Sequence, residues 1–89
     1  MKVISMGSVS GGSMPLAFLP EGAAGRVLRV LGGQGASRHL EDMGFAPPAR
    51  VKVLKSCPPG AMLVMVKDSR IALGWGMAMK ILVKSIEEI

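Results

Sequence analysis

The chain has 89 residues, which is enough for one small domain that buries about two thirds of the surface of its unfolded chain. Hydrophobic residues make up 49% of the chain but aromatic residues only 3%, and eleven Lys and Arg against six Asp and Glu give a formal net charge of +5. This composition excludes a core built on stacked aromatic rings, the single Cys57 excludes an internal disulfide, and the lack of an apolar run of about 20 residues excludes a transmembrane helix.

Residues 1–13 are rich in Gly and Ser in their second half, and they lack the continuous apolar stretch of a signal peptide. We therefore expect a flexible N-terminal extension over residues 1–13, one domain over residues 14–89, and a cytoplasmic protein. The positive charges are spread along the chain, which is typical of a solvated surface rather than of a nucleic-acid-binding tail.

The domain opens with a short apolar piece, Leu16 to Leu19, followed by a turn, Pro20-Glu21-Gly22. Proline presets φ in such a turn, and Gly22 can adopt a positive φ without steric penalty. Gly25 then begins the strand GRVLRVL, whose β-branched residues and interspersed Arg suit a partly solvated sheet.

A glycine-rich segment breaks this strand, and Ser37 is the expected N-cap of a short helix that ends near Met43. Gly44 falls at the position after a helix that favours a left-handed backbone. Phe45 can then contact Leu40 in the hydrophobic contact of a Schellman cap. The pattern therefore predicts that this short helix docks through one apolar patch.

After the helix, Pro47-Pro48 force an extended path into a strand over residues 51–56, in which Val and Lys alternate. The continuous apolar strand over residues 62–66 is predicted to be covered on both faces. Lys67 to Ser69 predict a hairpin turn, and residues 70–73 the returning strand.

Gly74 to Lys80 predict one helical turn or a tight loop, and residues 81–84 form the last strand. Five or six short strands with one or two short helical turns favour a mainly β fold. A small closed or nearly closed β-barrel is expected, because closure removes exposed strand edges.

The run SRHLEDMGFAPPARVKV, residues 37–53, resembles the signature of the FeoA family: a short helix with Arg and Leu, then Met-Gly and an apolar residue, then a proline turn into a Val-x-Val strand. The resemblance extends over about residues 14–84, through Leu16, Gly22 and Gly25 at the front and RIALGWGMAMKILV at the back. It implies an SH3-like β-barrel and a small cytoplasmic accessory of ferrous iron uptake that contacts FeoB, the membrane GTPase transporter.

The same barrel type forms the C-terminal domain of DtxR-type iron-dependent repressors, so a regulatory module of that kind stays an alternative. Two residues depart from the family pattern. Pro48 stands where the family often has Gly, and Asp68 stands near a hairpin tip where Gly is common. Both departures concern loop conformation rather than the strands.

No Ser-His-Asp arrangement and no GxxxxGK[ST] phosphate loop is present, so we expect neither enzymatic activity nor a cofactor. His39 and Asp42 have the i, i+3 spacing that a first-row metal could use on one helix face. Two ligands are fewer than tight sites generally have, which leaves these residues as weak metal candidates beside the ordinary interpretation of a solvated histidine and aspartate.

The segment Gly74-Trp75-Gly76-Met77 permits two interpretations: Trp75 plugs the end of the barrel, or it belongs to an exposed aromatic and methionine surface that binds a protein. We expect a FeoB-type partner, no nucleic acid and no direct membrane insertion, and a homodimer is left open. A basic nucleic-acid-binding barrel remains an alternative, although few aromatic residues are available for base stacking. The predicted partner-binding residues are Leu40, Met43, Phe45, Trp75 and Met77.

Overall fold

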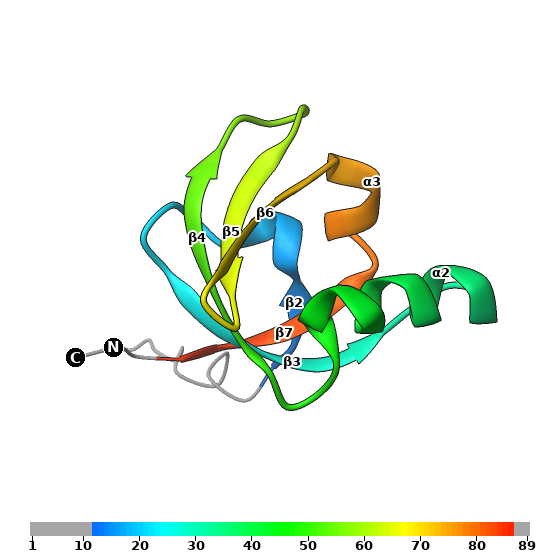
Figure 1. Cartoon of the computed structure of the whole chain (residues 1–89). Coiled ribbons are helices and arrows are strands. Elements are labelled where there is room, and N and C mark those ends of the chain that lie inside the picture. Colours follow the sequence, from blue (N-terminus) through cyan, green and yellow to red (C-terminus); the bar gives the residue numbers. More distant parts are fainter. Residues whose placement is uncertain (1–11, 87–89) are drawn as a thin grey trace.

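The computed structural model describes residues 12–86, so most of the predicted N-terminal extension lies outside the described residues, as do residues 87–89. Six antiparallel strands form one sheet in the order β2-β7-β3-β4-β5-β6. Figure 1 shows the strands curling around a common interior, with α2 projecting to one side. The elements are β2 (Met14–Pro15), the 3₁₀-helix η1 (Leu16–Phe18), β3 (Ala24–Val30), α2 (Gln34–Leu40), the π-turn η2 (Glu41–Phe45), β4 (Arg50–Ser56), β5 (Met62–Val66), β6 (Ser69–Leu73), α3 (Trp75–Ala78) and β7 (Ile81–Ile86).

The core is aliphatic, as the composition predicts, with Phe45 as its one aromatic member among the described residues. Every strand from β3 to β7 contributes to it, and so do η1, α2 and α3. The buried core residues are Leu16, Ala17, Leu19, Val27, Leu40, Phe45, Val51, Val53, Met62, Val64, Val66, Leu73, Ala78, Ile81 and Val83.

Among residues 12–86, no helix is long and apolar enough to cross a bilayer.

The alternation predicted for β4 is confirmed: Val51 and Val53 are buried, whereas Lys52 between them is exposed. The expectation that β5 is covered on both faces is wrong. Its residues alternate between buried and half-buried, because only the inner face of the strand meets the core. A single curled sheet has no second layer to cover its outer face.

The helix begins earlier than the sequence predicts. Gly33 is the N-cap of α2, and the Ser37 amide donates to the Gly33 carbonyl at 2.9 Å, so Ser37 lies inside the helix and is not its cap. The backbone alone closes this first turn, with no side-chain cap. At the other end, Gly44 has φ +113° and ψ 0°, which confirms the predicted positive φ where the helix stops.

Two further glycines have roles in the fold: Gly22 has the positive φ expected of it, whereas Gly25, expected to begin a strand, is the second residue of β3. Gly22 has φ +85°, and its amide donates to the Val53 carbonyl at 2.8 Å, which ties the first turn to β4. Gly25 lies where the chain packs closely: a Cβ there would be 3.0 Å from Cδ1 of Leu19 and 3.2 Å from Cβ of Val83. A larger residue at this position would require β3 to move away from its neighbours.

The hairpin between β5 and β6 turns through Lys67 and Asp68, with φ values of 50° and 65°. Asp68, which stands where the family often has glycine, thus adopts the left-handed conformation that Asp tolerates better than most residues. The segment after β6 resolves into the helical turn α3 rather than an open loop.

Candidate protein-binding surface

Phe18 is the most exposed large hydrophobic side chain of residues 12–86, with 58% of its surface in contact with solvent. It ends the short 3₁₀-helix η1, in which Leu16 and Ala17 are buried, and Leu19 after it is buried too. Side chains three residues apart share a side of a 3₁₀-helix, so Leu16 and Leu19 anchor the turn together. Burying them directs Phe18 away from the core.

Trp75 begins α3, a single helical turn whose first carbonyls accept hydrogen bonds from the backbone: the Ala78 amide donates to Gly74 at 3.0 Å, and the Met79 amide to Trp75 at 3.0 Å. Ala78 is fully buried and fixes the turn against the barrel. Trp75 itself is half-buried and packs on the edge of the core.

The rings of Phe18 and Trp75 form a tilted pair, with centroids 6.4 Å apart and ring planes at 51°. This separation lies within the range of favourable aromatic pairs. Residues from opposite ends of the described chain therefore meet at one surface spot, where η1 contacts α3. We call Phe18 and Trp75 the aromatic pair.

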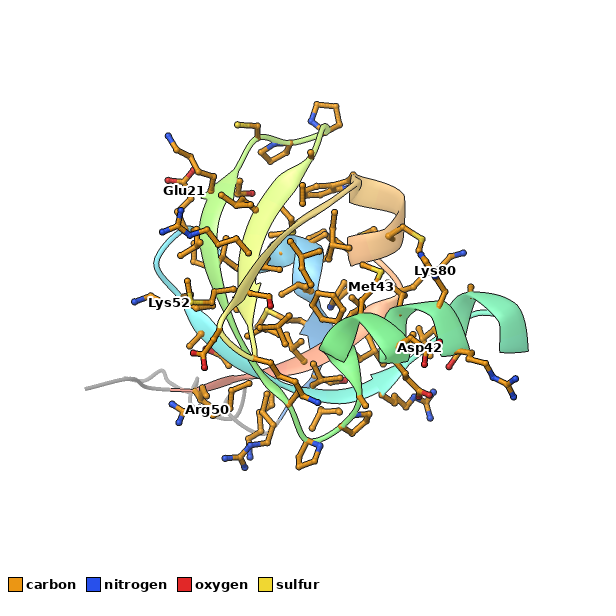
Figure 2. The ribbon with its side chains drawn as sticks, in the orientation of Figure 1. Glu21, Asp42, Met43, Arg50, Lys52 and Lys80 are labelled. Carbon is orange, nitrogen blue, oxygen red and sulfur yellow. The ribbon has the colours of Figure 1, made fainter. Side chains whose placement is uncertain are left out.

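The partner-binding residues predicted on the helix, unlike Phe18, are mostly buried in the core. Leu40 and Phe45 are both 0% exposed and belong to the core, so in this structure they hold α2 and η2 against the barrel and present no surface to a partner. Met43 is half-buried and Asp42 is exposed beside it (Figure 2). Of this helix group, only Met43 keeps partly accessible apolar surface.

Met77 lies on the same helical turn as Trp75 and is half-buried against the core. The structure thus joins Trp75 with Phe18, a residue that is not among those predicted from the sequence to bind a partner. One signal for it was available: four apolar residues in a row between Pro15 and Pro20 cannot all face inward from one short turn.

The metal candidates, His39 and Asp42, are both exposed at the end of α2 and in η2. Over residues 12–86, no three His, Cys, Asp or Glu side chains come together as a metal-binding group. Cys57 is an exposed free thiol in the loop after β4. A metal site at His39 and Asp42 therefore stays a prediction that rests on these two residues.

The fold is that of a small SH3-like barrel. A Stenotrophomonas maltophilia FeoA, solved in complex with zinc and described as a prokaryotic SH3 domain protein, matches it with a TM-score of 0.70 at 27% identity, over 79% of this chain and 88% of that one. This confirms the predicted fold class. The model of the FeoA domain matches residues 14–85, and the chain belongs to the FeoA family.

Individual relatives agree with this assignment. A Methanocaldococcus jannaschii protein named Fe(2+) transport protein A is 38% identical over 73 residues, which are 82% of this chain and 88% of the relative. A crystal structure of an iron uptake regulatory protein, FeoA, matches with a TM-score of 0.80 at 35% identity, over 84% of this chain and 100% of that one.

A manganese-dependent transcriptional repressor has the same fold, with a TM-score of 0.75 at 24% identity. The likeness covers 83% of this chain but only 42% of the repressor, and it concerns the fold alone. The expected relation between this barrel and a domain of metal-dependent repressors is therefore seen at the level of the fold.

Proposed function

We propose that this protein is a small cytoplasmic accessory of ferrous iron uptake that binds the cytoplasmic part of a FeoB-type membrane GTPase transporter. Membership of the FeoA family supports the process. The names of two relatives support it as well: one is called Fe(2+) transport protein A, and the other is described as a candidate activating factor of bacterial ferrous iron transport.

The observation that carries the proposal is the aromatic pair. Phe18 exposes most of a ring that the fold does not use, beside a Trp75 that the core holds in place. Aromatic side chains on a rigid surface dominate many protein interfaces, because they bury a large area at a small loss of conformational entropy. A partner that covers Phe18 would bury its ring against Trp75, which already packs against the core.

The protein acts in this proposal by binding and not by catalysis. A binding protein changes the activity of a partner only through unequal affinity for the partner's conformations. The proposed accessory therefore favours one nucleotide state of the transporter's GTPase region over the other.

Isothermal titration calorimetry tests this proposal, with the GTPase region of the cognate transporter in its GDP and GTP-analogue states as titrant. We expect saturable binding that differs between the two states and a Kd for Phe18→Ala raised about tenfold or more. Leu28→Ala is the matched control, since Leu28 is the other large hydrophobic side chain exposed among residues 12–86, at 41%, and lies on β3, whereas the pair lies on η1 and α3.

A Kd that Phe18→Ala and Trp75→Ala both leave unchanged contradicts the proposed surface. Absence of any binding to the transporter, together with salt-sensitive binding to duplex DNA, contradicts the proposed function and supports the regulatory or nucleic-acid alternative.

A further inference from the structure

Strand register gathers positive charges that are far apart in the sequence. Arg26 on β3 stands directly opposite Lys84 on β7 and directly opposite Arg50 on β4. Lys67, just beyond the end of β5, continues this series, because Arg50 and Lys67 line the same hollow of about 260 Å³. We call these four residues, three on neighbouring strands and Lys67 in the turn after β5, the basic row.

All four side chains of the basic row are exposed, and the exposed Lys52 also lines the hollow. The strands β2 to β7 contain no Asp or Glu, and Asp68 at the hairpin tip is the one acidic residue among those that line the hollow. Figure 1 shows β4, which carries Arg50 and Lys52, and α3, which begins with Trp75, on opposite sides of the barrel, and Figure 2 shows Arg50 and Lys52 on the β4 side. The basic row is thus a surface separate from the aromatic pair.

Part of this arrangement is unfavourable for the isolated fold. Like charges directly opposite each other on neighbouring antiparallel strands destabilise a sheet, and Arg26 and Lys84 form such a pair. An anionic surface laid against the row would turn this repulsion into attraction. We propose that the basic row docks this protein peripherally on a bilayer surface that contains anionic lipids.

The extent of the row favours a bilayer over a small anion. Four strands at about 4.8 Å spacing spread the charges over roughly 14 Å, which is wider than one phosphate or carboxylate group. Single-stranded nucleic acid would require aromatic rings for stacking, and the aromatic pair lies beside α3, away from this row.

Vesicle co-sedimentation of the full chain tests the inference, with phosphatidylcholine vesicles compared against vesicles that also contain phosphatidylglycerol. We expect binding only to the anionic vesicles, and its loss at high salt. Each Lys or Arg near an anionic surface contributes about 1 kcal/mol, which is about fivefold in the partition coefficient. Arg26→Glu, a change of two charges, should therefore weaken partitioning by roughly 25-fold.

Arg26→Glu separates binding from folding, because it converts the repulsive cross-strand pair with Lys84 into an attractive one. The melting temperature of this variant should equal or exceed that of the unchanged protein while its vesicle binding falls. Asp68→Asn should act in the opposite direction and strengthen binding about fivefold, since it removes the acidic group beside the hollow.

Arg38→Glu is the matched control, because Arg38 is exposed on α2 and the substitution changes the net charge by the same amount. An equal loss for Arg38→Glu and Arg26→Glu overturns the inference, since net charge would then explain the binding. So does equal binding to neutral vesicles, or a preference for duplex DNA or an acidic peptide over anionic vesicles at the same salt. The transporter titration depends on Phe18 and Trp75, so the membrane inference and the proposed function can fail separately.

Discussion

Replacing Gly44 with alanine tests the structural account of how the helix ends. Gly44 has φ +113° and ψ 0°, a region that L-residues rarely adopt. A Cβ at this position would lie 3.5 Å from Cγ1 of Val66 and 3.7 Å from Cδ of Lys67, which are ordinary van der Waals distances. The penalty for alanine is therefore conformational and does not come from steric overlap.

The magnitude follows from two opposing effects. Holding an L-residue in a sparsely populated backbone region costs about 1–3 kcal/mol. Alanine also restricts the unfolded chain relative to glycine, which offsets the penalty by about 0.4–1 kcal/mol. The free energy of unfolding of Gly44→Ala should therefore fall by about 1–2 kcal/mol, which lowers the Tm of a domain of this size by about 5–15 °C.

Gly35→Ala provides the matched control for thermal unfolding followed by circular dichroism. Gly35 lies within α2, and a Cβ there meets nothing within 4 Å, so the same substitution should raise the stability by about 0.5–1 kcal/mol. The opposite signs of the two shifts are the expected result. If Gly44→Ala were as stable as the unchanged protein, the positive φ would not be what ends this helix.

Three further predictions concern side chains whose surroundings the structure defines. In urea denaturation, Phe45→Ala should cost about 3–5 kcal/mol and the exposed Phe18→Ala under about 1 kcal/mol; equal losses would contradict the burial of these two rings. Asp68→Gly should raise the stability by about 0.5 kcal/mol, because glycine suits the φ of 65° at the hairpin tip, and a loss would mean that the Asp side chain itself supports the turn. Glu21→Ala should lower the stability by about 1 kcal/mol, since the Ser56 amide donates to Oε2 of Glu21 at 2.8 Å, whereas Glu21→Gln, which keeps an acceptor oxygen, should lose less.

Those parts of the fold that depend on neighbours in the sequence could be predicted from it. The alternation of β4 and the positive φ of Gly22 and Gly44 follow from local residue chemistry, and the structure has them as expected. The order of these signals also sufficed to indicate the family. Local chemistry predicts well where the chain turns and which strand residues face inward.

The wrong predictions have a common physical cause. In each, interactions with other parts of the chain compete with the local preference of the residue, and the local sequence does not show which is stronger. Ser37 is a good capping residue, but the backbone from Gly33 onward already forms helical hydrogen bonds, so the helix starts a turn earlier. Leu40 and Phe45 were correctly grouped as apolar, yet the barrel interior buries them completely, which leaves Met43 as the accessible part of that group. Apolar character alone does not distinguish a docking surface from a core.

Phe18 and the basic row show what only the tertiary structure supplies. Phe18 meets Trp75 because the turn after β2 contacts the turn before β7, and these segments are more than half the chain apart. The charges look evenly spread in the sequence, but antiparallel register aligns Arg26 with Arg50 and Lys84. Because the aromatic pair and the basic row lie on different sides of the barrel, one copy of the protein can contact a protein through the first surface and a lipid surface through the second. If both contacts occur together, anionic vesicles should not displace the transporter's GTPase region from the protein.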